Sequence, residues 1–135
     1  MGYHVADAAR MEWEERAPVV EGQQPRQAAD VTGAASLKQS RARVWRYPPG
    51  TRGRRHADHA QEEVFVVLSG TLTMLLDDPP ERVDVGPQSV VAVEPMTPLQ
   101  VRNEGGEELV LYIYGAPPEQ AGADFFDDVD VLPAY

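Results

Sequence analysis

The chain has 135 residues, with 22 acidic against 12 basic side chains and a formal net charge of −10. This length suits one domain with one core, and the acidity argues against non-specific binding to nucleic acid or to anionic membranes. The sequence contains no cysteine, which excludes disulfides, thiolate ligands and cysteine nucleophiles. The first fifteen residues include four acids and no apolar run, and no later stretch is long and apolar enough to span a bilayer. We therefore expect a cytoplasmic protein without a signal peptide.

Residues 1–35 show little periodicity and are interrupted by several prolines and glycines. This pattern indicates an extended N-terminal arm, of the kind that becomes ordered by lying across a sheet or a neighbouring subunit. Within the arm, residues 11–16 are expected to form a short strand or a turn. His4 is interpreted as a solvated histidine and not as a metal ligand.

Residues 31–57 contain no acidic side chain but seven of the twelve basic ones, which are Lys38, Arg41, Arg43, Arg46, Arg52, Arg54 and Arg55. The segment from Arg41 to Tyr47 alternates in character and predicts a strand with one wetter face. One interpretation places arginines at the mouth of a pocket, where they bind a carboxylate or a phosphate. The interpretation favoured by the sequence is a solvated strand and loop, because runs of charge usually lie at the surface.

Residues 50–70, GTRGRRHADHAQEEVFVVLSG, combine metal-ligand side chains with an obvious strand. The β-branched and aromatic residues near the end of this stretch predict the strand. His56 and Asp58 have the same parity and are expected to project to one side, while Glu63 enters from the next strand. His59 has the opposite parity, but a turn at this point would let it substitute as a ligand.

The rest of the chain consists of short predicted strands separated by Gly and Pro turns, at residues 71–76, 82–85, 89–93, 99–103 and 108–114. This pattern predicts an all-β antiparallel sandwich or barrel. The last of these strands is apolar on both faces, so we expect it to be buried on both sides. Residues 117–135 are acidic but partly apolar, and we expect them to pack on the barrel or on a partner subunit.

The spacing within residues 50–70 resembles the first cupin motif, which has a glycine, His-x-His, a glutamate and a second glycine. Those positions are held here by Gly50, His56, Asp58, Glu63 and Gly70, so that an aspartate replaces the second histidine. Fixed positions at fixed spacing seldom coincide by chance, which makes this motif fairly specific.

The second cupin motif is eroded. Asn103 keeps its place, but Leu99 stands where the histidine ligand would be. Gln88, Glu94 and Met96 replace the leading glycine, the proline and the second glycine of the motif.

The resemblance implies a double-stranded β-helix, or jelly-roll barrel, over residues 36–116, between the arm at 1–35 and the tail at 117–135. In this family a metal is held by three histidines and a glutamate. The corresponding set here is His56, Asp58 and Glu63, whose imidazole and carboxylate donors suit Fe, Mn, Ni or Zn. Because Asp58 and Leu99 remove two of the four expected ligands, a metal-free pocket or a weakly occupied site is the better expectation.

The first functional hypothesis is a cupin that binds a small organic molecule inside its barrel. The predicted pocket residues are Phe65, Leu99, Val101, Arg54 and either Trp45 or Tyr112. One alternative is a metal-dependent oxygenase, isomerase or decarboxylase acting on a small acid or sugar, with an arginine from residues 52–55 holding its anionic group. Another is a non-catalytic sensor or assembly module. Small cupins commonly dimerise, so a homodimer is expected.

Overall fold

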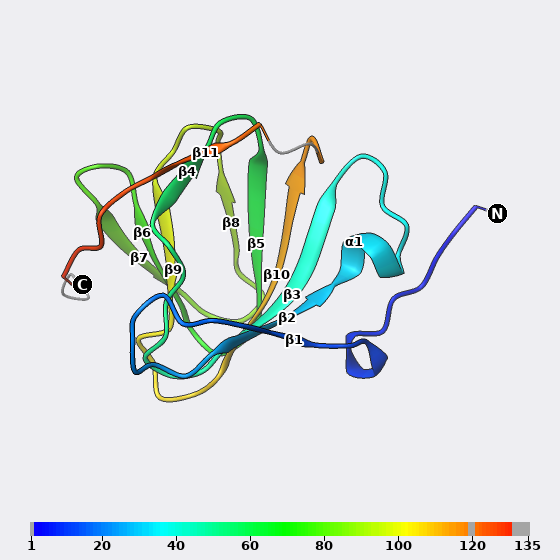
Figure 1. Cartoon of the computed structure of the whole chain (residues 1–135), viewed down its shortest axis with the longest axis horizontal. Helices are drawn as coiled ribbons and strands as arrows, with labels where there is room; N and C mark the ends of the chain where they lie inside the picture. Colours follow the sequence, from blue (N-terminus) through cyan, green and yellow to red (C-terminus); the bar gives the residue numbers. More distant parts are fainter. Residues whose placement is uncertain (1, 119–120, 131–135) are drawn as a thin grey trace.

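The computed structural model describes residues 2–118 and 121–130, which form two facing antiparallel sheets (Figure 1). The larger sheet has the strand order β1-β2-β3-β10-β5-β8 and the smaller sheet the order β11-β4-β9-β6-β7. The elements in chain order are η1 (Ala8–Arg10), β1 (Glu14–Arg16), β2 (Arg26–Asp30), α1 (Val31–Ala34), β3 (Arg41–Tyr47), β4 (His56–Asp58), β5 (Glu62–Ser69), β6 (Leu72–Leu76), β7 (Glu81–Val85), β8 (Val90–Val93), β9 (Leu99–Arg102), β10 (Leu109–Ala116) and β11 (Ala123–Phe125). The expected all-β double-stranded β-helix is confirmed. Neither helical element in the described part of the chain has the length and apolar character needed to cross a membrane.

Strand β10 lies inside the larger sheet, between β3 and β5. Side chains alternate along a strand, so Leu111 is buried between the sheets while Val110 and Tyr112 pack on the outer face. Both faces of β10 are therefore covered, as its apolar sequence predicted.

Two hydrophobic clusters hold the fold together. The main cluster fills the space between the sheets, and its fully buried members include Phe65, Met74 and Leu111. Burial of each such side chain stabilises the fold by about 1.5–3 kcal/mol. The second cluster lies on the outer face of the larger sheet, where Val44 and Trp13 are among the residues that join β3 to the N-terminal segment.

The N-terminal segment contributes two strands to the larger sheet. Strand β1 lies within the predicted strand or turn at residues 11–16, whereas β2 was not predicted as a strand. The sequence of β2, RQAAD, has little intrinsic strand preference. Its antiparallel pairing with β3, which places Ala28 opposite Trp45, overrides that local preference.

The C-terminal segment lies along the smaller sheet, close to the first-motif strand β4. Strand β11 pairs with β4 and places Phe125 opposite His56. Further along, Asp128 accepts a hydrogen bond from the buried Arg102 at 3.3 Å. The apolar residues at 131–132, which were expected to contribute to this packing, lie outside the described residues.

The two glycines of the first motif are favoured at their positions for different structural reasons. Both Gly50 and Gly70 have φ of +80°, a left-handed conformation that favours glycine. A Cβ on Gly70 would lie 2.5 Å from the carbonyl oxygen of Glu108, whereas a Cβ on Gly50 would meet open space. Only Gly70 is therefore required for close approach of the backbone as well as for its conformation.

Candidate functional site

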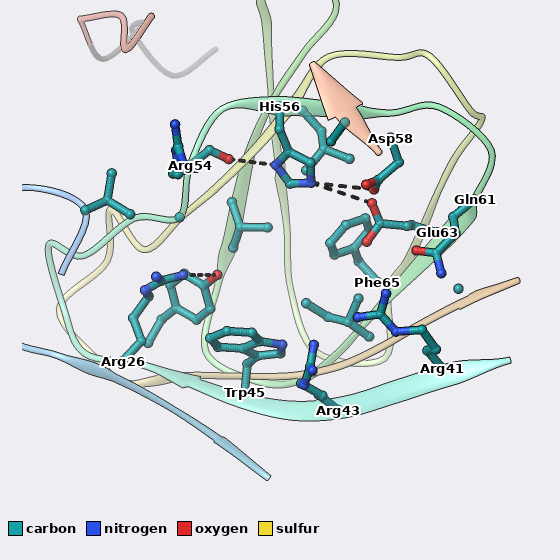
Figure 2. A pocket seen from close by; sticks show the side chains of 18 of the residues that line it. Arg26, Arg41, Arg43, Trp45, Arg54, His56, Asp58, Gln61, Glu63 and Phe65 are labelled. Carbon is teal, nitrogen blue, oxygen red and sulfur yellow. Dashed lines mark hydrogen bonds and ion pairs between the residues drawn. The ribbon is translucent and has the colours of Figure 1, made fainter. Parts of the chain in front are cut away.

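Three potential ligands converge at one end of the space between the sheets (Figure 2). His56 and Asp58 project to the same side of β4, as their parity predicted, and Glu63 comes from β5 in the other sheet. One donor atom from each lies within 4.8 Å of the others. This group joins the two sheets through polar side chains.

The orientation of His56 leaves one ring nitrogen directed at the two acids. Its Nδ1 donates a hydrogen bond to the carbonyl oxygen of Arg54 at 2.9 Å, because a carbonyl can only accept. Its Nε2 lies 3.5 Å from Oδ2 of Asp58 and 3.8 Å from Oε1 of Glu63, which are ion-pair distances longer than good hydrogen bonds. Nε2 is therefore the ring atom available to a metal or a ligand.

The three side chains shift one another's pKa values. Burial disfavours the charged form of His56, but its contacts with Asp58 and Glu63 outweigh burial and raise its pKa to about 10. Contact with His56 is the main reason that the pKa of Asp58 falls to about 2. Burial raises the pKa of Glu63 to about 7, with the charge of Asp58 adding to the shift and His56 opposing it.

The position that a fourth ligand would occupy is apolar. Leu99 on β9 pairs directly with His56 on β4, and its side chain is buried. A histidine at this position would supply another donor beside His56, whereas leucine supplies hydrocarbon. The eroded second motif predicted that the histidine ligand would be absent, and Leu99 occupies that position beside His56.

His59 and Glu62 lie away from this group. The Nε2 atom of His59 hydrogen-bonds to Oδ1 of Asp124, a residue of β11, at 2.9 Å. Glu62, which precedes Glu63 on β5, is exposed. The structure therefore brings His56, Asp58 and Glu63 together and does not add His59 as a substitute.

A cavity of about 610 Å³ extends from this group into the space between the sheets. Four predicted pocket residues line it, namely Trp45, Phe65, Leu99 and Val101. Arg54 also lines it, from an exposed position where its guanidinium lies 3.9 Å from the centre of the Phe125 ring. The cavity thus has an apolar floor and a polar end at His56.

The prediction that Tyr112 lines the pocket was wrong. Tyr112 lies on the outer face of β10 and packs in the second hydrophobic cluster. Ile113, the next residue along, faces the cavity instead. The parity of this strand could not be assigned from sequence because both of its faces are apolar.

The favoured interpretation of the β3 arginines, a solvated strand face, does not hold for Arg41 and Arg43, which line the cavity as in the alternative interpretation (Figure 2). Arg26 on β2 lines it too. A usable signal was present: Arg41 and Arg43 share the parity of Trp45, which was itself placed in the pocket. Charge alone made this face appear to be the wet one.

A family model for the cupin domain matches residues 43–114, which is more than half of the sequence. The chain belongs to the cupin family. In this cupin the first motif is retained except at Asp58, and the second has lost its histidine at Leu99. No curated protein sequence matches this cupin significantly.

Several solved structures share the fold of this cupin at low sequence identity. The polyketide cyclase RemF from Streptomyces resistomycificus is 16% identical, with a TM-score of 0.74 over 93% of this chain and 87% of that chain. A sugar phosphate isomerase from Silicibacter pomeroyi is 20% identical, with a TM-score of 0.69 over 82% of this chain and 73% of that chain. A predicted oxalate decarboxylase from Thermotoga maritima is 16% identical, with a TM-score of 0.72 over 84% of this chain and 98% of that chain. At these identities the similarity establishes the fold alone.

Proposed function

We propose that this cupin binds a small organic molecule inside its barrel, beside a weak divalent-metal site formed by His56, Asp58 and Glu63. The observation that carries the proposal is the convergence of these three side chains from both sheets on one end of a cavity of about 610 Å³. Such a cavity is large enough for a metabolite-sized ligand.

The spacing of the donor atoms is compatible with a bound metal. Four-coordinate metals with ligand bonds of about 2.1 Å separate their ligand atoms by about 3.4 Å, close to the 3.5 Å between Nε2 of His56 and Oδ2 of Asp58. Oε1 of Glu63 is buried and has no hydrogen-bond partner among the described residues. Two carboxylates held close together also favour a cation between them.

The same site is built to hold a metal weakly. Leu99 offers no donor, so only three protein ligands are available, and affinity falls as ligands are lost. Oxygen and imidazole donors suit Fe(II), Mn(II), Ni(II) or Zn(II). A metal bound there would supply Lewis-acid polarisation of a ligand oxygen. We expect protein prepared with a chelator to be metal-free and still to bind its organic ligand.

A second candidate is a metal-dependent enzyme acting on a small acid or sugar. It is favoured because the three ligand residues line the cavity, where a substrate could reach their donor atoms. Proteins of the same fold are named as an isomerase of sugar phosphates and as a predicted decarboxylase of oxalate. One fold hosts many reactions, so these names guide the choice of substrates to test and nothing more.

Calorimetric titration of chelator-treated protein with Mn(II) tests the metal site. We expect one saturable site in the wild type and a loss of at least about tenfold in affinity for Glu63→Gln. Glu62→Gln, which changes the exposed neighbour, is the matched control and should bind as the wild type does. Leu99→His should tighten binding by roughly tenfold through a fourth ligand, whereas Leu99→Ala should not.

Absence of saturable Mn(II) binding, or equal losses for Glu62→Gln and Glu63→Gln, would contradict the metal site. The organic ligand is tested separately, by native mass spectrometry of metal-free protein against a panel of metabolites. A well-folded sample that retains none of them would count against the binding proposal.

A further inference from the structure

One wall of the cavity is basic although the chain as a whole is strongly acidic. Arg41 and Arg43 reach the cavity from β3, and Arg26 reaches it from β2 (Figure 2). We propose that Arg41 and Arg43 bind the oxyanion group, a carboxylate or a phosphate, of the organic molecule that the cavity takes. This inference deepens the proposed function and rests on its claim that the cavity holds a small organic ligand.

The register of the larger sheet places the two arginines beside the acidic group. Gly115 on β10 pairs with Arg41 on one side and with Glu63 on the other. Residues paired in this way project from the same face, so Arg41 and Glu63 face the cavity across a residue without a side chain. Their Cα atoms are two strand spacings apart, roughly 10 Å, so one small ligand can contact both side chains.

The next row of the sheet repeats this arrangement with an apolar centre. Ile113 on β10 pairs with Arg43 on one side and with Phe65 on the other. A ligand whose oxyanion is held by the arginines would therefore lay its body over Ile113 and Phe65. Trp45, two residues beyond Arg43 on the same strand face, adds a flat aromatic surface.

The arginines of this wall form no close ion pair, although Arg41 is near enough to Asp58 to contribute to the lowered pKa of that carboxyl. Among the described residues, neither Arg41 nor Arg43 has a carboxylate within the 4.0 Å ion-pair distance, whereas Arg52 and Arg102 both pair with Asp128. Nε of Arg43 is also buried without a hydrogen-bond partner among those residues. The guanidinium groups that line the cavity therefore keep donors that an oxyanion can take up by paired hydrogen bonds.

The electrostatic surroundings of Arg43 agree with this geometry. Burial lowers the pKa of Arg43, and the positive charges of Arg41 and Arg16 lower it further. Asp30 and Glu14 oppose the shift only in part. Positive charges are therefore concentrated on this wall, where an anion is favoured.

Arg26 supports this wall from the neighbouring strand. Its guanidinium donates a hydrogen bond to the hydroxyl of Tyr47 at 3.2 Å and lies 5.2 Å from the centre of the Trp45 ring. These contacts fix Arg26 beside the aromatic part of the cavity. We therefore assign the oxyanion to Arg41 and Arg43 and a positioning role to Arg26.

The test uses chelator-treated full-length protein, titrated by calorimetry with benzoate and, in a second arm, with inorganic phosphate. We expect saturable binding of at least one probe, and the tighter one identifies the oxyanion as carboxylate or phosphate. Arg41→Gln and Arg43→Gln should each weaken binding roughly ten- to hundredfold, as expected for loss of charge-assisted hydrogen bonds. Arg46→Gln is the matched control, because Arg46 lies on the same strand but stacks on Trp13 at the outer face.

Failure of both probes to saturate the wild type, or an equal loss for Arg46→Gln, would overturn the inference. If a variant does not fold, the Nε–H NMR signals of Arg41 and Arg43 in the wild type decide the question. These signals should shift on titration, and signals that stay unmoved at saturation would also overturn the inference. Because the metal is absent throughout, loss of Mn(II) binding leaves this result intact, and failure here leaves the metal site intact.

Discussion

At the scale of single residues, the chemistry of this cupin is set by two substitutions in an otherwise retained site. Asp58 turns a neutral ligand position into an acidic one, and it lies close enough to Glu63 to raise the pKa of that carboxyl. Leu99 removes a donor and leaves Nε2 of His56 facing only the acids and the cavity. With these two substitutions, the site has three titratable side chains beside an apolar wall instead of four metal ligands.

This cluster predicts a decline in stability at alkaline pH for chelator-treated protein. The pKa of His56 is raised from 6.5 to about 10, so its stabilisation is fully present below pH 6.5 and is lost as the pH rises toward 10. We expect the free energy of unfolding to fall by on the order of 3 kcal/mol across that window. Urea unfolding at a series of pH values measures this change.

His56→Gln should flatten the decline between pH 6.5 and 10, and His4→Gln, at an exposed position, should leave it unchanged. Glu63 also has a raised pKa, so it contributes a separate decline between pH 4.5 and about 7. An undiminished alkaline decline in His56→Gln would show that other groups cause it.

Residue-level prediction from sequence succeeded where spacing carried the information. Motif spacing and parity were enough to bring His56, Asp58 and Glu63 together. The same reasoning failed for Arg41 and Arg43, because alternation shows which residues share a face but not which face is inward. A wall of arginines facing a cavity has the same pattern as one facing water.

At the scale of elements, one acidic side chain, Asp128, makes several of the contacts that hold the C-terminal segment to the barrel, in addition to the pairing of β11 with β4. Asp128 accepts a hydrogen bond from Gln100 at 2.8 Å and forms an ion pair with Arg52 at 2.7 Å. It also contacts the buried Arg102, whose charge would otherwise be less well compensated. The sequence predicted that this acidic tail would pack on the barrel or on a partner subunit, but not that it would pack against β4 and the neighbouring strands.

We expect Asp128→Asn to lower the free energy of unfolding by roughly 1–2 kcal/mol, since it weakens several partly exposed charge-assisted contacts. Hydrogen exchange should also speed up in β11, whose pairing with β4 depends on the segment remaining docked. Asp130→Asn removes the same charge from an exposed position and serves as the control. Equal exchange rates in β11 of the two variants would exclude this role for Asp128.

At the scale of the whole molecule, the fold was predictable because its signals are redundant. Short strands, Gly and Pro turns and the motif glycines all indicate the same barrel, and Gly70 is fixed by its contact with the backbone at Glu108. Strand β2 was not predictable, because its pairing with β3 depends on the assembled sheet and not on its own composition. Local sequence carries little information about such partners.

The homodimer expected from the sequence remains a prediction at this scale. Leu68 and Val90 are more than half exposed, and Val90 belongs to β8, an edge strand of the larger sheet. Exposed apolar side chains at a sheet edge favour association. Sedimentation at micromolar concentration should give twice the mass of the chain, and a monomer there would contradict the prediction.

The cavity reaches beyond the part of the chain that defines its family. The family match covers residues 43–114, yet Arg26 and Phe125 both line the cavity. Trimming the protein to its conserved domain would keep His56 and Glu63 but remove parts of two walls. For the same reason, relatives grouped by their motif residues alone can differ in what they accept, so their terminal segments must be compared before a ligand is transferred from one to another.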